Sequence, residues 1–328
     1  MRLVSIIVPL YNEEDNVQYL YDELCSVAAK LEDNVEFIFV NDGSRDKTLE
    51  RMREITATDN RVTIVEFRRN FGQTAAMAAG FDYASGDIVA LLDGDLQNDP
   101  AELPRMIAKL DEGYDMVAGW RKNRQDAFIS RKIPSMLANR LISRITNVRL
   151  HDYGCSLKVM RGEVAKNINL YGEMHRFIPA LAEEMGIKLA EMPVNHRPRL
   201  YGTSKYGISR TFRVILDLLT VKFFLGYSKR PIHLFGFLGL ISGFIGTLLM
   251  VMMVLQRFIY ALPMGNRPLL ALAVMMIMIG LQFLCFGLLA EVSVRTYHES
   301  QDKKIYSVRN VFRGGLNTED RPKKVVGC

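Results

Sequence analysis

The sequence predicts an α/β domain with a doubly wound, mainly parallel sheet, followed by a C-terminal hairpin of two transmembrane helices. Two observations predict this architecture. Short apolar runs rich in β-branched residues alternate with helical patterns over the first 120 residues. Two long, uninterrupted apolar runs follow after residue 230. A chain of 328 residues is long enough for both parts.

Five runs are predicted to be buried strands of that sheet: Val4–Leu10, Val35–Asn41, Val62–Phe67, Ile88–Asp93 and Met116–Gly119. The helical patterns between them are Glu13–Lys30, Lys47–Thr56, Gln73–Ala84 and Ala101–Glu112. Ser44 or Asp46 is expected to cap the second helix, and Asp99 followed by Pro100 is expected to open the fourth.

The two apolar runs, residues 232–255 and 269–290, contain no Lys, Arg, Asp or Glu, and each is long enough to cross a bilayer. The alternative is a pair of buried helices in a soluble core, which are usually shorter and keep a polar stripe. Lys and Arg flank the hairpin on both sides but are sparse in the short linking loop. The positive-inside rule therefore predicts that both ends lie in the cytoplasm.

The charge changes sign along the chain. Residues 1–115 hold 11 Lys and Arg against 23 Asp and Glu, whereas the remainder holds 31 against 13. The net charge of +6 is thus a difference between two halves, and the basic half also holds the apolar runs. We expect an anionic membrane surface as its partner, and no nucleic acid. The cysteines are scattered without a metal-type pair, which predicts reduced thiols in the cytosol.

These patterns predict three parts. Residues 1–230 form a cytoplasmic domain, in which residues 120–230 are a basic part that meets the membrane. Residues 231–294 form the hairpin, and residues 295–328 form a basic cytoplasmic tail. Within the basic part, Phe128–Ile145 is amphipathic and suits the headgroup layer of a membrane, although a solvated basic face is the alternative.

Polar residues follow the predicted strands where parallel sheets bind ligands. The first strand leads into Tyr11-Asn12-Glu13, the second into Asp42-Gly43-Ser44, and the fourth into Asp93-Gly94-Asp95. No G-x-G-x-x-G follows the first strand and the chain has no G-x-x-x-x-G-K-[ST], which argues against a dinucleotide dehydrogenase and a P-loop NTPase. Two carboxylates one residue apart on a tight turn can share one Mg²⁺ or Mn²⁺ ion, although acidic turns without a metal are common.

Several motifs together resemble the family-2 glycosyltransferases of GT-A fold. They are Val8-Pro9-Leu10-Tyr11-Asn12-Glu13, Val40-Asn41-Asp42-Gly43-Ser44, Arg69-Asn70-Phe71-Gly72 and Leu92-Asp93-Gly94-Asp95-Leu96-Gln97, in the family's order. The later Asp152-Tyr153-Gly154-Cys155, His175-Arg176-Phe177 and Ser204-Lys205-Tyr206, with the hairpin, resemble the polyprenyl-phosphate glycosyltransferases. Within that group they are similar to dolichyl-phosphate mannose synthases and bacterial undecaprenyl-phosphate aminoarabinose-type transferases.

For the donor, a UDP- or GDP-sugar, the resemblance implies a nucleotide site formed by Pro9, Tyr11, Glu13, Asp42 and Asp93. Asp93, Asp95 and Gln97 would form the metal site, with Mg²⁺ or Mn²⁺ as cofactor, and Asp95 would be catalytic. Helix capping and turn formation are the alternative for Glu13 and Asp42, and a plain loop position is the alternative for Gln97.

For the acceptor, the resemblance implies that Arg121, Arg131 and Ser135 bind the lipid phosphate, with Lys205 on a phosphate-binding loop. Asp152 is the candidate base. Some relatives have the acidic residue where this chain has Gly154 and Cys155, and a phosphate monoester is already nucleophilic at neutral pH. A positioning role for Asp152 is therefore the alternative.

The expected reaction is metal-dependent, inverting transfer of one sugar to undecaprenyl or dolichyl phosphate at the inner membrane, by a chain that can assemble into a homo-oligomer. A processive polysaccharide synthase is a second hypothesis, but it requires a Q-x-x-R-W motif and more spans, and the single tryptophan is Trp120. A non-enzymatic two-span subunit with a nucleotide-binding head is a third.

Overall fold

The computed structural model describes residues 1–122, 143, 148, 150–170, 174–198, 231–260, 268–300 and 304–314. The chain divides into two compact units. The first is the head, Met1–Leu218 with Lys304–Cys328, and the second is the hairpin unit, Leu219–Lys303.

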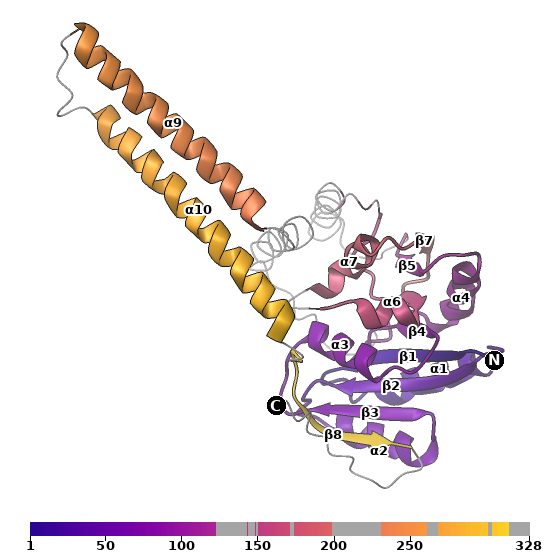
Figure 1. The fold of residues 1–328 in the computed structure, drawn as a ribbon. Coiled ribbons are helices and arrows are strands. Elements are labelled where there is room, and N and C mark those ends of the chain that lie inside the picture. The colour runs from indigo at the N-terminus through magenta and orange to yellow at the C-terminus, as the bar shows by residue number, and fades with distance from the viewer. Residues whose placement is uncertain are drawn as a thin grey trace. The chain divides into compact units, whose positions relative to one another are not determined.

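The head contains a sheet of eight strands within the described residues (Figure 1). The strands are β1 (Leu3–Leu10), β2 (Asn34–Asn41), β3 (Val62–Phe67), β4 (Ile88–Leu91), β5 (Met116–Trp120), β6 (Lys158–Arg161), β7 (Leu189–Pro193) and β8 (Val308–Arg313). Their order is β7-β5-β6-β4-β1-β2-β3-β8. The β4-β1-β2-β3 block is parallel, and so is the β5–β7 pair, whereas β6 and β8 run antiparallel to their neighbours. The mainly parallel sheet predicted from the sequence is confirmed.

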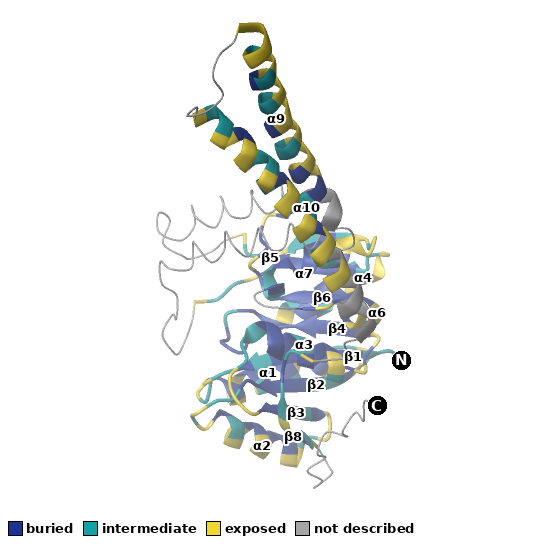
Figure 2. Cartoon of the chain, turned by 60° about the vertical axis from the view of Figure 1, so that its left-hand side comes forward, coloured by how far each residue is buried: buried dark blue, intermediate teal, exposed yellow. Residues whose placement is uncertain are grey.

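Helices cover both faces of this sheet. The described helices of the head are α1 (Val17–Ala28), α2 (Thr48–Thr58), α3 (Gln73–Tyr83), α4 (Leu103–Asp111), α6 (Gly162–Asn167) and α7 (Ile178–Glu184), with 3₁₀ turns η1 (Pro100–Glu102) and η3 (Met174–Phe177). Alternate residues of β1, such as Val4, Ile6 and Val8, join one apolar core with α1, α2 and α4. α3 lies on the opposite face, where a Cβ at Gly80 would clash with Ile7. Figure 2 shows the resulting buried sheet.

The first helix starts four residues later than its sequence pattern predicts. The backbone N–H groups of Glu13 and Glu14 donate to Thr48 Oγ1 (2.8 Å) and Asp46 Oδ2 (3.2 Å) in the neighbouring loop. These bonds hold residues 13–16 in a turn, and α1 begins at Val17. Asp46 also accepts the N–H of Thr48 at 3.0 Å, as expected for a residue that caps α2.

Residues 295–328 were predicted to form a tail, but the first of them belong to a helix. α10 (Pro268–Ser300) continues past residue 294, and residues 308–313 form β8 on the free edge of β3. The head is therefore built from chain on both sides of the hairpin. Tyr306 stacks on Phe67 with ring centroids 5.1 Å apart, and its hydroxyl donates to Asp82. These contacts attach the returning chain to the head.

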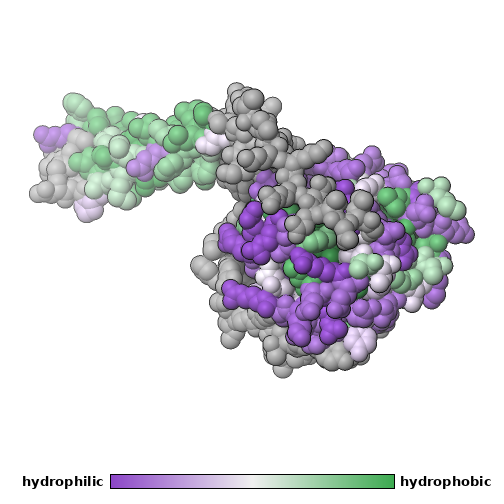
Figure 3. Space-filling model, turned by 90° about the horizontal axis from the view of Figure 1, so that it is seen from below, coloured by the Kyte–Doolittle hydropathy of each residue, from purple (hydrophilic) through white to green (hydrophobic). Residues whose placement is uncertain are grey.

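The hairpin unit consists of α9 (Pro231–Tyr260) and α10 (Figure 1). Phe235–Tyr260 and Pro268–Ala290 are long and apolar enough to cross a membrane. Large side chains stay exposed along them; Phe244 is 70% and Phe258 82% accessible. Figure 3 shows the contrast in hydropathy between these helices and the mostly hydrophilic visible surface of the head. Exposed apolar surface of this extent needs a covering such as lipid.

Close approach of the two helices depends on glycine. A Cβ at Gly280 would lie 2.7 Å from the carbonyl oxygen of Gly239 and 2.8 Å from the backbone nitrogen of Gly243. We therefore expect Gly280→Val to separate the helices and to lower the unfolding temperature of the protein in detergent. The matched control is Gly243→Ala, because a Cβ at Gly243 meets nothing within 4 Å. Equal unfolding temperatures for the two variants would contradict this packing.

Candidate functional site

The carboxyl ends of β1 and β2 lead into two loops that are hydrogen-bonded to each other. The N–H of Asn12 donates to Ser44 Oγ (3.0 Å), and the N–H of Arg45 donates to Asn12 Oδ1 (2.8 Å). Asn12 adopts a positive φ of 54°, a conformation that asparagine tolerates better than most residues. The two loops therefore form one connected rim beyond the sheet.

Three residues predicted to bind nucleotide lie on or beside this rim. Pro9 pairs with Val40 in the β1–β2 register, and Pro9, Tyr11 and Glu13 are all partly exposed. Glu13 Oε2 accepts a hydrogen bond from Asn16 Nδ2 at 2.5 Å. That bond belongs to the turn before α1, so the turn-forming role considered for Glu13 is present in the structure.

Asp42, at the end of β2, is oriented into the protein. Its two oxygens accept the backbone N–H groups of Phe71 (2.6 Å) and Gly72 (3.0 Å), which precede α3. Burial raises the pKa of Asp42 to about 6, although these hydrogen bonds oppose the shift. Asp42 therefore fixes the two residues that precede α3, and its role in nucleotide binding stays a prediction.

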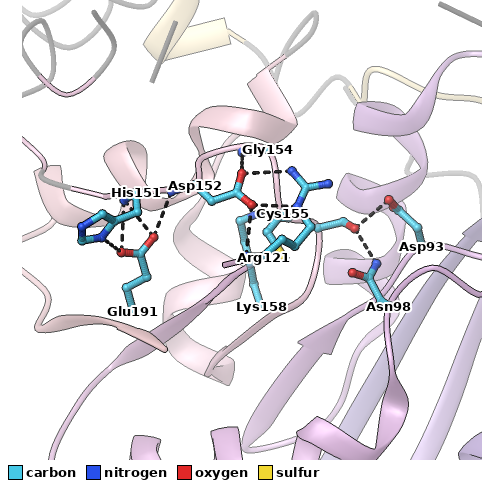
Figure 4. Close-up of polar contacts among 10 residues, drawn as sticks. Asp93, Asn98, Arg121, His151, Asp152, Gly154, Cys155, Lys158 and Glu191 are labelled. Carbon is cyan, nitrogen blue, oxygen red and sulfur yellow. Dashed lines mark hydrogen bonds and ion pairs between the residues drawn. The ribbon is translucent and has the colours of Figure 1, made fainter. Parts of the chain in front are cut away.

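The Asp93–Asp95 turn follows β4 at the same edge of the sheet. Asp93 is held on both oxygens: Ser156 Oγ donates to Oδ2 (Figure 4), and Gln73 Nε2 donates to Oδ1, each at 2.6 Å. Burial raises the pKa of Asp93 to about 6, and repulsion from Asp95 adds to the shift. In a largely buried site, a bound cation would offset the repulsion between these two carboxylates.

Asp95 and Gln97 complete this turn. The N–H of Gln97 donates to Asp95 Oδ1 at 3.2 Å, and Asp95 is 9% exposed. A Cβ at Gly94 would lie 2.4 Å from Leu10 Cδ2 and 3.2 Å from the carbonyl oxygen of Pro9, so the turn passes close to β1. Leu96 adopts a positive φ of 60°, an uncommon conformation for a residue of its size and the tightest point of the turn.

The turn suits a hard divalent cation only in part. Among the described residues, no group of three or more His, Cys, Asp and Glu side chains converges in a way that could hold a metal. Mg²⁺, however, typically uses one or two carboxylates and takes its other ligands from water and substrate phosphates. Asp93 and Asp95 fit that smaller requirement.

Arg121 and Asp152 form a buried ion pair about the end of β5. Arg121 Nε and Nη2 donate to the two Asp152 oxygens at 2.7 and 2.9 Å (Figure 4). The N–H of Gly154 also donates to Asp152, and Asp152 is only 4% exposed. Because the carboxylate is bonded to a guanidinium on both oxygens, the geometry favours the positioning role for Asp152 over the role of a base.

Glu191 on β7 fixes the chain beside this pair. Its carboxylate accepts the backbone N–H groups of His151 and Asp152 and contacts His151 Nδ1 at 2.7 Å (Figure 4). His151 in turn stacks on Trp120, with ring centroids 4.3 Å apart. Glu191 therefore determines where Asp152, and through it Arg121, is placed.

Gly154 and Cys155 supply no carboxylate beside Asp152. Burial raises the pKa of the Cys155 thiol to about 11, so it stays protonated at neutral pH. Lys158, at the start of β6, donates from Nζ to the carbonyl oxygen of Cys155, and burial lowers its pKa. The buried amino group of Lys158 therefore fixes the loop that contains Ser156.

The structure thus brings Asp93, Asp95, Arg121 and Asp152 to neighbouring strand ends. Arg131, Ser135 and Lys205 lie outside the described residues, so their predicted roles stay predictions. Four residues that hold the site together were not predicted from the sequence: Gln73, Asn98, Ser156 and Glu191. Asn98 follows the acidic turn, and Gln73 and Ser156 each come directly after a motif of the family resemblance, so these three could have been included, whereas Glu191 lies in no motif.

The histidine of the His175-Arg176-Phe177 motif is structural. His175 Nδ1 lies 2.8 Å from Thr74 Oγ1 on α3, and burial lowers the pKa of His175 to about 3. A folded-state pKa below the unfolded value of 6.5 means that the unfolded chain binds the proton first. Stability attributable to His175 is therefore complete above pH 6.5 and is lost as the pH falls towards 3.

The lowered pKa of His175 predicts a difference in stability between wild type and His175→Asn that changes with pH. We expect wild type to lose up to about 2 kcal/mol relative to His175→Asn when the pH falls from 7.5 to 5, because only wild type has the buried imidazole. Unfolding midpoints of both proteins at the two pH values measure it, since the contributions of carboxyl groups cancel in the difference. A gap between the two proteins that does not change with pH would show that His175 titrates normally.

Known proteins share this chain's sequence and fold. The family model for Glycosyl transferase family 2 matches residues 5–168. Dodecaprenyl-phosphate galacturonate synthase of Rhizobium johnstonii is 46% identical over 313 residues, which are 94% of this chain and 93% of that protein. Undecaprenyl-phosphate 4-deoxy-4-formamido-L-arabinose transferase of Edwardsiella ictaluri is 34% identical over 325 residues, 98% of each chain.

A solved structure supports the fold. Glucosyl-3-phosphoglycerate synthase from Mycobacterium tuberculosis, crystallised with Mn²⁺, uridine diphosphate and phosphoglyceric acid, superposes with a TM-score of 0.53. It is 18% identical and covers 69% of this chain and 79% of its own, which shows a common GT-A-like fold. Given the family model and the relatives that match from end to end, the chain belongs to glycosyltransferase family 2 and is a glycosyltransferase.

Proposed function

We propose that this chain transfers one sugar from a nucleotide-diphosphate sugar to a polyprenyl phosphate at a membrane. The observation that carries the proposal is the extent of the similarity to lipid-phosphate sugar transferases, which includes both the head and the hairpin. The relatives named for dodecaprenyl and undecaprenyl phosphate match 94% and 98% of this chain. Their names favour a bacterial polyprenyl phosphate over dolichyl phosphate as acceptor.

The donor site is proposed at the rim formed by the ends of β1, β2 and β4. Pro9, Tyr11 and Glu13 border the nucleotide, and Asp42 acts there by fixing the start of α3. Asp93 and Asp95 would hold Mg²⁺ or Mn²⁺, with Gln97 beside them, and such an ion would supply positive charge to a departing diphosphate. The mutual repulsion of Asp93 and Asp95 supports this assignment.

The acceptor site is proposed at the Arg121–Asp152 pair, with Arg131, Ser135 and Lys205 as further phosphate ligands. Arg121 attracts the lipid phosphate, and Asp152 holds the guanidinium in place. One phosphate oxygen bonds to the anomeric carbon as the bond from that carbon to the nucleotide diphosphate breaks, and a single displacement inverts the anomeric centre. With a second pKa near 6, the phosphate needs no protein base at neutral pH.

The chain's connectivity supports a cytoplasmic head on a membrane hairpin. The chain leaves the head before α9 and returns to it in β8, so both ends of a spanning hairpin lie on the head's side of the bilayer. Lys229 and Arg230 precede the first span and Lys303 and Lys304 follow the second, and by the positive-inside rule these charges favour the cytoplasm for that side.

Transfer of label into lipid tests the proposal. The full chain in detergent is incubated with undecaprenyl phosphate, Mg²⁺ or Mn²⁺, and radiolabelled UDP- or GDP-sugars, starting with galacturonate and 4-deoxy-4-formamido-L-arabinose donors. We expect label in the organic phase from at least one donor, and none when EDTA replaces the metal. Absence of lipid-linked label across the donors would refute the proposed reaction, and equal transfer with EDTA would refute the metal dependence.

A further inference from the structure

The side chains around Asp93 come from three separate segments. Ser156 Oγ donates to Asp93 Oδ2 at 2.6 Å, and Asn98 Nδ2 donates to Ser156 Oγ at 2.7 Å (Figure 4). Gln73 Nε2 binds the other oxygen of Asp93 at 2.6 Å. The serine hydroxyl uses its one proton toward Asp93 because an amide N–H already points at its oxygen.

The backbone on both sides of Ser156 is fixed. Cys155 and Leu157 are 1% and 0% exposed, and Lys158 Nζ binds the carbonyl oxygen of Cys155. Asn98 is 4% exposed, and its backbone forms a bridge with His196. The buried backbone therefore holds Ser156 and Asn98 in place beside Asp93.

We infer that Ser156, oriented by Asn98, is a positioning residue that sets the direction of the Asp93 carboxylate in the donor site. The inference rests on the proposed function, since it assigns Ser156 a role through Asp93. Without the hydroxyl, Asp93 keeps its contact with Gln73 but loses the donor that fixes Oδ2. The nucleotide and the metal would then meet a carboxylate that must first be ordered.

Binding of Mn²⁺ with UDP or GDP tests this inference without turnover. Calorimetry on the full chain in detergent compares wild type with Ser156→Ala, using whichever nucleotide binds wild type. A hydrogen bond to a charged group predicts that Ser156→Ala weakens binding by roughly tenfold or more. Ser156→Thr, which keeps the hydroxyl, should restore most of the affinity. The matched control is Ser26→Ala on α1, whose exposed hydroxyl donates to the carbonyl oxygen of Asp22.

A double-mutant cycle with Asn98→Ala tests the orienting role. Asn98→Ala should weaken binding alone but add little in the Ser156→Ala background, because its effect passes through the serine. Unchanged affinity in Ser156→Ala, or fully additive effects, would overturn the inference. If Ser156→Ala does not fold, Asn98→Ala and Ser156→Thr decide it. Failure of wild type to bind Mn²⁺ with either nucleotide would instead refute the proposed donor site, and the inference with it.

Discussion

Replacing Asp95 by alanine should reduce sugar transfer by about a thousandfold or more, because the proposed metal ion, which would compensate the charge of the leaving diphosphate, would lose one of its two carboxylate ligands. The fold should survive, since the turn keeps Gly94 against β1 and the contacts of Asp93 with Gln73 and Ser156. Initial rates at saturating donor, measured with the lipid-transfer assay, check the expected loss.

The matched control for Asp95→Ala is Asp22→Ala. Asp22 is exposed on α1, where its contacts are to Gln18 and Ser26 of the same helix. We expect wild-type rates for Asp22→Ala and unfolding temperatures close to wild type for both variants. If Asp95→Ala kept more than a tenth of the wild-type rate while remaining folded, Asp95 would have no role in the metal site.

The second large effect is expected at the Arg121–Asp152 pair. Removal of one partner leaves an uncompensated charge in a buried site, so each single alanine variant should lose about 3–5 kcal/mol of stability. The double variant Arg121→Ala with Asp152→Ala should regain part of that stability, because no charge is left unpaired. Activity should be lost in Arg121→Ala and should not return in the double variant, since the proposed phosphate ligand is absent from both.

All four proteins of this cycle are compared by unfolding in denaturant and by their transfer rates. The first measurement gives the contribution of the pair to stability, and the second gives its contribution to activity. A double variant less stable than either single variant would contradict the buried pair. Near-normal affinity for polyprenyl phosphate in Arg121→Ala would contradict the acceptor assignment.

Asp152→Asn separates positioning from base catalysis. As a positioning residue, Asp152 should tolerate asparagine with a raised KM for the lipid, a kcat within about tenfold of wild type and an unchanged pH profile near the phosphate pKa of about 6. If Asp152 is the base, Asp152→Asn should instead lower kcat by two or more orders of magnitude. The limb of the pH profile that reports its titration should also disappear. That second result would make Asp152 the base and would refute the geometry-based assignment.

The donor half of the fold could be predicted from sequence because its signals are local. Buried parallel strands such as Val62–Phe67 are continuous apolar runs, and the helices between them keep a helical period. The polar residues that follow those strands meet at one edge because parallel strands share their carboxyl ends there. That rule was sufficient to predict that the end of β1, Asp42 and Asp93 lie at one edge of the sheet.

The remainder depends on contacts between distant segments, which local patterns do not record. Strand β8 lies beyond the hairpin and is stabilised by β3 and by the stacking of Tyr306 on Phe67. The sequence of its six residues therefore does not by itself predict a strand. Ser156 binds Asp93 across 63 positions, and Glu191 binds Asp152 across 39. For Asp42, the sequence left nucleotide binding and helix capping open. The structure adds that its carboxylate accepts the N–H groups of Phe71 and Gly72 before α3, a contact that no local pattern records.

The mass of the lipid product tests the central claim most directly. The full chain is incubated with undecaprenyl phosphate, the accepted nucleotide sugar and the metal, and the extracted lipid is examined by mass spectrometry. We expect a lipid with the mass of undecaprenyl phosphate plus one sugar residue, which contains a single phosphate. The expected co-product is the free nucleoside diphosphate. A lipid diphosphate, a ladder of several sugars, or the nucleoside monophosphate as co-product would contradict transfer of one sugar to a lipid monophosphate.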